Sequence, residues 1–187
     1  MILVLTCGIP YRVTRDSSTI EGVGMDKQEL MEQLVEHYRH PRHRHQLPDA
    51  DVVMPGGNPG CGDIVTIYLK VDPEGHLVAA ASFEGEGCTI SQAAADILLD
   101  VVNEERWTLD QVLEADYHLM AELIGEEAVR LRPRCATLAL GTLKAAVTKY
   151  LRDRLRREAG LDIVEQENER FGIVTGDQVE MPRDVSS

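Results

Sequence analysis

Aromatic side chains are scarce in this sequence: they make up 4% of its 187 residues, with one tryptophan and two phenylalanines. An interior built from such a chain must be largely aliphatic. No stretch approaches the roughly 20 consecutive apolar residues that a membrane-spanning helix needs. The opening MILVLTCGIPYR has neither a basic segment nor a small-residue cleavage site, so no secretory signal peptide is expected. These absences predict one compact domain, located in the cytoplasm, with flexible tails.

Positive charge is also in short supply. Lysine and arginine number 19 against 32 aspartates and glutamates, so the net charge is −13. Nucleic acids and anionic membranes are both bound through positive charge, and neither is expected as a partner. The chain also lacks a Ser–His–Asp pattern, an H-E-x-x-H motif and a phosphate-binding loop, which disfavours a hydrolase.

Cysteine occurs four times, at Cys7, Cys61, Cys88 and Cys135, and never as C-x-x-C. That absence argues against a thioredoxin-like redox centre and a zinc ribbon. In a cytoplasmic chain a free thiol is buried, binds a metal or reacts. The last three cysteines share a setting, because each follows a glycine or an arginine at a junction between a loop and a regular element. We predict that these three act together and that Cys7 has no role.

Two of these cysteines are predicted to open helices. Residues 89–92, TISQ, fit a capping box and predict a helix that begins at Cys88. Cys135 opens a second apolar, helix-like segment. A helix N-terminus carries partial positive charge, which favours a thiolate. We expect Arg134 to lower the pKa of the Cys135 thiol further and to stabilise a thiolate or persulfide there.

The third cysteine stands in the loop PGGNPGCGD, residues 55–63. Gly60 and Gly62 free the backbone and let a ligand or partner approach Cys61 closely. Asp63 follows two residues later and points to the same side in an extended segment. The predicted site therefore consists of three thiolates and one carboxylate: Cys61, Asp63, Cys88 and Cys135.

Four histidines gather at and after the end of the first predicted helix. They are His37, His40, His43 and His45. They could form a metal site, but a solvated basic helix end that complements the helix dipole is the favoured interpretation.

Hydrophobic periodicity predicts the regular elements. We expect a helix over 26–40, a hairpin of strands 63–72 and 76–85, a helix over 88–105, one or two short helices within 108–124, and a long helix over 135–160. Residues 41–60 look like a loop. Residues 1–24 are expected to be a disordered tail or, if Met25 is the natural start, an artefact of annotation. The domain then spans 25–160, and 161–187 form a partly ordered tail.

Four segments carry a resemblance to a known family: EHYRHPRHRHQLPDADVV, GGNPGCGDIVTIYLKVD, FEGEGCTISQAAADIL and RPRCATLALGTLKAAV. In this order they resemble the NifU/IscU-type iron–sulfur cluster assembly scaffold family, over residues 28–150. Arg134 stands where IscU-like members carry histidine, which is similar to the SufU-like branch. The resemblance implies an α+β fold: a small three-stranded antiparallel sheet with helices packed on one face, and a third strand within 49–55.

The same resemblance implies a function and its components. Cys61, Asp63, Cys88 and Cys135 take the family's ligand positions, with Cys135 or Cys61 accepting persulfide sulfur from a cysteine desulfurase. The chain would then hold iron and a transient [2Fe-2S] cluster, pass it to apo-proteins, and act as a carrier rather than an enzyme. Two alternatives stay open: a zinc-dependent sulfur acceptor of the desulfurase, and an interaction module with a structural zinc. A homodimer bridged by a cluster is compatible with each metal-binding interpretation.

Overall fold

The structure, a computed structural model, describes residues 27–160. Cys7 and both expected tails, 1–24 and 161–187, lie outside these residues. In chain order the elements are α1 (Lys27–Arg39), β1 (Val52–Asn58), β2 (Asp63–Val71), β3 (Val78–Glu86), α2 (Thr89–Glu104), α3 (Leu109–Glu114), α4 (Tyr117–Ile124), α5 (Glu126–Leu131), α6 (Pro133–Ala136) and α7 (Leu138–Glu158).

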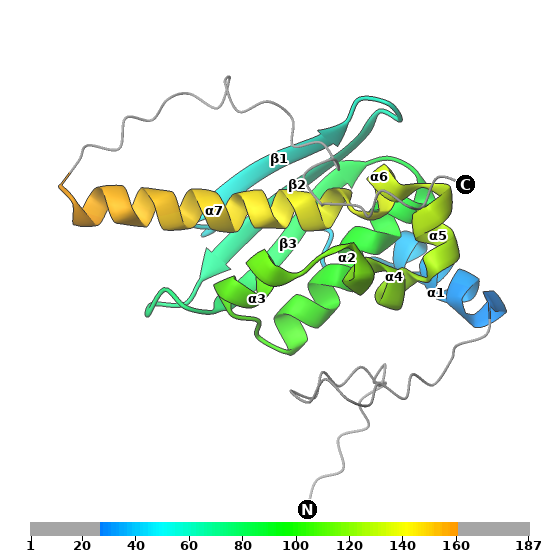
Figure 1. The fold of residues 1–187 in the computed structure, drawn as a ribbon, viewed down its shortest axis with the longest axis horizontal. Coiled ribbons are helices and arrows are strands. Elements are labelled where there is room, and N and C mark those ends of the chain that lie inside the picture. Colours follow the sequence, from blue (N-terminus) through cyan, green and yellow to red (C-terminus); the bar gives the residue numbers. More distant parts are fainter. Residues whose placement is uncertain (1–26, 161–187) are drawn as a thin grey trace, which may run out of the picture.

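The three strands form one antiparallel sheet in the order β1-β2-β3. Side chains alternate along β2: Val65, Ile67 and Leu69 are fully buried, whereas Ile64 on the opposite face is half exposed. Helix α7 packs against β1 and β2, and α2 packs against β3, so the long helices cover the sheet (Figure 1). This arrangement confirms the predicted α+β fold with a small three-stranded antiparallel sheet.

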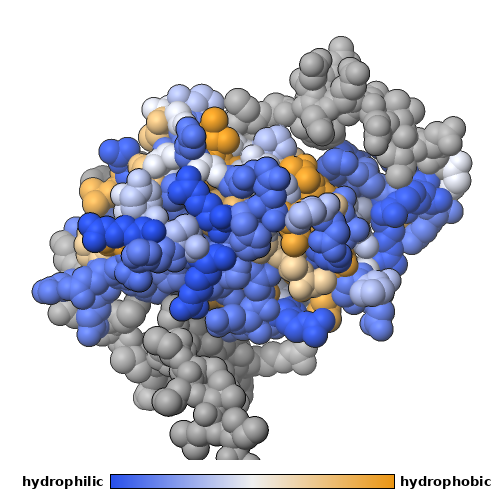
Figure 2. Space-filling model, turned by 180° about the vertical axis from the view of Figure 1, so that it is seen from behind, coloured by the Kyte–Doolittle hydropathy of each residue, from blue (hydrophilic) through white to orange (hydrophobic). Residues whose placement is uncertain are grey.

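The interior is almost entirely aliphatic, as the composition predicts. Phe83 is the one aromatic residue among the largest fully buried side chains, which otherwise include Ile67, Leu98 and Leu140. Figure 2 shows that polar residues dominate the face seen from behind, with small apolar areas between them. None of the helices between residues 27 and 160 combines the length and apolar character that crossing a membrane requires.

Strand β1 carries the sequence Val-Val-Met-Pro-Gly-Gly-Asn, which the residue pattern alone classes as a loop, and that interpretation is wrong for residues 52–58. Pro55 is tolerated because β1 is an edge strand, where one side of the backbone needs no partner. Gly56 is required by close packing, since a Cβ there would overlap the side chain of Thr142 on α7. The strand suggested by the resemblance, within 49–55, is real but extends to Asn58.

The predicted long helix over 135–160 is in fact two helices. Pro133 begins the short α6, and α7 starts only at Leu138 after a break at Thr137. Two short helices fill 108–124, and a further one, α5, was not predicted. The break matters for the site, because it moves Cys135 away from the start of a long helix.

Candidate metal centre

Cys61 lies in the tight turn that joins β1 to β2. The carbonyl oxygen of Asn58 accepts hydrogen bonds from the backbone N–H groups of Cys61 (3.1 Å) and Gly62 (2.8 Å). Gly62 has φ = 73°, the left-handed region that glycine enters without strain. The turn leaves Cys61 exposed at the end of the sheet. The predicted purpose of the glycine-rich loop, access to this thiol, agrees with its geometry.

Asp63 opens β2 and connects it to the start of α2. Its side chain is buried, and its carboxylate accepts hydrogen bonds from the backbone N–H of Cys88 (3.0 Å) and from the Cys88 thiol (3.4 Å). Burial alone would raise the pKa of Asp63, but hydrogen bonds from Cys135, Cys88 and Ser91 outweigh it and hold the pKa below its usual range. This carboxylate is therefore charged at neutral pH.

Cys88 is the N-cap residue of α2, and its Sγ accepts a hydrogen bond from the backbone N–H of Ser91 at 3.4 Å. The predicted helix start is confirmed. The predicted capping box is not, because Cys88 rather than Thr89 occupies the cap position.

Cys135 is the third residue of the four-residue helix α6 and is 1% exposed. Its Sγ lies 3.5 Å from that of Cys61 and receives a hydrogen bond from the Asn58 side chain at 3.6 Å. Burial raises the pKa of this thiol strongly, and the neighbouring Asp63 and Cys61 raise it further. The prediction of a lowered pKa is therefore wrong: the short helix and Arg134 do not compensate for burial beside a carboxylate.

The four predicted ligands converge although they come from three distant segments. One ligand atom each of Cys61, Asp63 and Cys135 lies within 4.8 Å of the others. Cys88 joins this group through its 3.4 Å contact with Asp63. Three thiols and one carboxylate form a donor set that suits tetrahedral zinc and also iron. The arrangement can hold a metal once the metal displaces the protons of the thiols.

Arg132 is a site residue that the sequence did not predict. Its Nη1 lies 4.0 Å from the Sγ of Cys61, and this contact, together with the nearby Cys135 and Cys88, raises the pKa of the guanidinium. Arg134 is exposed, and its expected role at Cys135 stays a prediction. The segment RLRPRC offers arginine at three alternating positions, so the turn between α5 and α6 decides which of them contacts Cys61.

The histidines divide into two groups. His37 and His43 are not solvated as predicted: they bind two buried carboxylates of α2, with His37 Nδ1 2.7 Å from Asp96 and His43 Nε2 2.7 Å from Asp100. Asp96 also accepts the backbone N–H of His43 at 2.8 Å. These contacts, the His–Asp network, attach the end of α1 to α2. His40 and His45 are exposed, as expected.

The Asn58 side chain holds the Cys61 turn and the Cys135 thiol in place, so its replacement should lower both stability and metal affinity. The buried side chain accepts the backbone N–H of Gly60 (3.1 Å) and donates to Cys135. We expect Asn58→Ala to lower the free energy of unfolding by about 1–3 kcal/mol, because the buried Cys135 thiol and the Gly60 N–H both lose their hydrogen-bond partner. Metal affinity should fall about 10–100-fold, as is usual for groups that orient ligands.

Urea unfolding and competition with a chromophoric chelator measure these two effects. Gln46→Ala removes an exposed amide that bonds Glu84 and serves as the control. It should change stability by less than about 0.5 kcal/mol. An unchanged metal affinity in Asn58→Ala would show that Asn58 does not position Cys135.

Comparison with known proteins identifies the family. A model of the NifU-like N terminal domain matches residues 29–157. The iron-sulfur cluster assembly scaffold protein IscU of Thermotoga maritima is 34% identical over 135 residues, which cover 65% of this chain and 94% of that protein. The zinc-dependent sulfurtransferase SufU of Bacillus subtilis is 30% identical, over 62% of this chain and 87% of that one.

Solved structures show the same fold. A putative iron-sulfur cluster assembly scaffold protein for the SUF system from Fervidobacterium islandicum superposes with a TM-score of 0.52 at 23% identity, covering 62% of this chain and 94% of that one. The N-terminal NifU-like protein of Brucella abortus gives a TM-score of 0.56 at 20% identity, covering 65% and 93%. With a family model that spans most of its length, this chain belongs to the NifU-like N-terminal domain family.

Proposed function

We propose that the chain is a scaffold on which iron and sulfur are assembled into a transient [2Fe-2S] cluster for transfer to apo-proteins. The observation that carries this proposal is the convergence of Cys61, Asp63, Cys88 and Cys135 at one end of the sheet. Clusters that are kept for electron transfer are usually held by four thiolates. A carboxylate is a harder ligand and binds cluster iron less tightly, which suits a cluster that must leave.

Cys61 is the better of the two proposed sulfur acceptors. It is exposed, whereas Cys135 is buried, and the Arg132 guanidinium lies beside its sulfur. In the transfer, the Cys61 thiolate attacks the outer sulfur of a persulfide on the cysteine desulfurase. The sulfur–sulfur bond breaks, the desulfurase cysteine leaves as a thiolate, and Cys61 becomes the persulfide. Arg132 would stabilise the negative charge at Cys61 before and after this step.

The second candidate function is that of a zinc-dependent sulfur acceptor. The same three thiols and carboxylate would supply four ligands, the number that zinc takes in a structural site, and the SufU relative is named a zinc-dependent sulfurtransferase. Bound zinc would keep the thiols deprotonated. Sulfur would then reach Cys61 by the same exchange, so the two functions share the residues and the desulfurase partner but differ in the resident metal.

Within the chain we assign either function to the domain 25–160, in which the family match lies. A cluster shared by two chains would make the active form a homodimer, because the thiol of Cys61 is accessible from outside.

Anaerobic reconstitution with iron, cysteine and a cysteine desulfurase, set beside the metal content of the chain as purified, tests the proposal. A scaffold should yield a visible-absorbing chain with iron and acid-labile sulfide in equal amounts. A sulfur acceptor should instead hold one tight zinc per chain, form no labile sulfide and accelerate the desulfurase. Tight zinc without any effect on the desulfurase would contradict both functions and leave a structural zinc module.

A further inference from the structure

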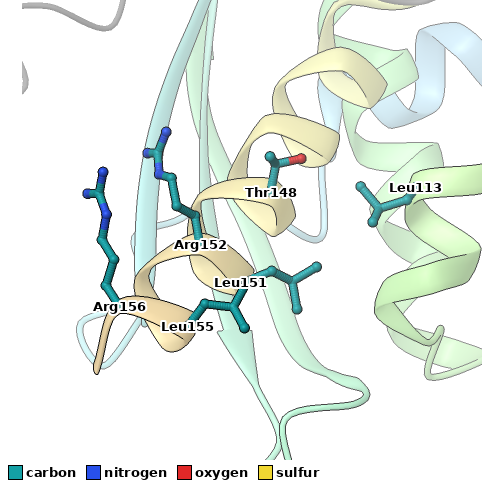
Figure 3. Close-up of a pocket in the computed structure, with 6 residues that line it drawn as sticks. All are labelled: Leu113, Thr148, Leu151, Arg152, Leu155 and Arg156. Carbon is teal, nitrogen blue, oxygen red and sulfur yellow. The ribbon is translucent and has the colours of Figure 1, made fainter. Parts of the chain in front are cut away.

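The groups that an oxidant can attack gather at one end of the molecule. A shallow groove between α3 and the last turns of α7 is lined by leucine, arginine and threonine side chains (Figure 3). None of these side chains carries sulfur. The three thiols within residues 27–160 instead belong to the metal centre, near the start of α7, where Cys61 and Cys135 contact each other.

The contact between Cys61 and Cys135 brings two sulfur atoms together from distant parts of the chain. Their Sγ atoms lie 3.5 Å apart, although 74 positions separate the residues in the sequence. A disulfide bond is about 2.0 Å long, so the two atoms must approach by about 1.5 Å. Cys135 is buried in α6, whereas Cys61 is exposed in the turn between β1 and β2. The exposed Cys61 side chain can therefore turn toward its buried partner.

We propose that Cys61 and Cys135 form a reversible disulfide when a peroxide oxidises the metal-free chain. A cysteine that reacts with peroxides is typically accessible and stands beside a second thiol that attacks the first oxidation product. Cys61 is exposed and meets the oxidant first, and Cys135, which is 1% exposed, is the thiol in contact with it. Such a contact makes the second reaction intramolecular and fast.

The oxidation has two balanced steps. First, the Cys61 sulfur attacks hydrogen peroxide, the oxygen–oxygen bond breaks, and Cys61 becomes a sulfenic acid while one water leaves. The guanidinium of Arg132, 4.0 Å from this sulfur, can donate to the departing oxygen. Second, the Cys135 sulfur attacks the Cys61 sulfur, the sulfur–oxygen bond breaks, and a second water leaves. Asp63 accepts a hydrogen bond from Cys135 and can pass the thiol proton to that water. Two thiols are oxidised, and one peroxide is reduced.

The third thiol of the site is held by other partners. Cys88 Sγ contacts the Asp63 carboxylate at 3.4 Å and accepts the backbone N–H of Ser91, also at 3.4 Å, so it faces an oxygen and a nitrogen. We therefore expect one disulfide, with Cys88 left as a free thiol. The disulfide would remove two of the four proposed metal ligands until a thiol reductant reopens it. This consequence rests on the proposed metal site, whereas the disulfide itself does not.

Oxidation of the full chain with Cys7→Ser tests the proposal, because the three remaining thiols all lie in the site. The chain is reduced, freed of metal with a chelator, treated with equimolar hydrogen peroxide, alkylated and digested. We expect the thiol count to fall from three to one, with a peptide pair that links Cys61 to Cys135. Dithiothreitol should restore all three thiols.

Two further variants in the same background identify the partners. Cys88→Ser is the matched control and should form the same bond. Cys135→Ser should instead accumulate a Cys61 sulfenic acid, which dimedone traps. Circular dichroism verifies that each variant is folded.

Two results would overturn the proposal. A linked peptide that contains Cys88 as the main product would show that a different pair closes. Surviving thiols, or disulfides only between chains, would show that Cys61 and Cys135 do not close. The experiment uses no iron, sulfide or desulfurase, so the proposed function can fail while the disulfide forms, and the reverse.

Discussion

A Cys135→Ser variant is expected to bind zinc or iron more than about 100-fold more weakly than the parent chain, since even the groups that merely orient ligands are worth 10–100-fold. Serine is a poor ligand for a soft metal and does not ionise at neutral pH. Cys135 is also the thiol that contacts both Cys61 and the Asn58 amide, so its loss removes the centre of the site.

Competition with a chromophoric chelator measures this loss, alongside circular dichroism to verify the fold. Cys61→Ser and Cys88→Ser should show similar losses. Cys7→Ser is the matched control, because the same chemical change falls outside the proposed ligand set and should leave the affinity unchanged. If all three site variants bound metal like the parent, the ligand assignment would be wrong.

An Asp96→Ala variant should lose about 2–5 kcal/mol of unfolding free energy, because it removes two hydrogen bonds and each group left unpaired costs about 1–3 kcal/mol. Asp96 is fully buried and accepts both the His37 side chain and the backbone N–H of His43. Its removal leaves those donors without an acceptor and detaches the end of α1 from α2.

Urea unfolding, monitored by circular dichroism, measures this loss as a lower urea concentration at the midpoint of unfolding. Glu104→Ala removes a carboxylate from the same helix, but one that is exposed and lies 3.9 Å from Arg42. It should cost less than about 0.5 kcal/mol. Asp96→Asn keeps an oxygen for the His43 N–H and should fall between the two. Equal midpoints for Asp96→Ala and Glu104→Ala would mean that the His–Asp network does not hold α1 in place.

Local patterns predicted the elements whose own residues determine them. The alternation of apolar residues in 63–72 and 76–85 led to strands that end within about one to two residues of β2 and β3. The residue pattern did not predict strand β1, because Pro55 and Gly56 have poor strand propensity. Pro55 is tolerated there because β1 is an edge strand, and Gly56 is needed because α7 packs closely against it. Only the family resemblance pointed to it.

The ligand set was predictable, whereas its electrostatics were not. Cys61, Asp63 and Cys88 carry their settings in the neighbouring sequence. The raised pKa of Cys135 comes from burial and from Asp63 and Cys61, which are 72 and 74 residues away in the chain. The contact of Arg132 with Cys61, and the contacts of His37 and His43 with carboxylates of α2, also depend on tertiary structure that no local pattern contains.

The origin of the ligands in three separate segments has a consequence for the lifetime of the chain. A bound ion would close the stretches 61–88 and 88–135 into loops and fasten the sheet to two helices. Free energy of binding then also opposes unfolding. Proteases that cleave transiently opened chains would remove empty molecules before loaded ones. Occupancy of the site by a metal would in this way determine which molecules resist proteolysis.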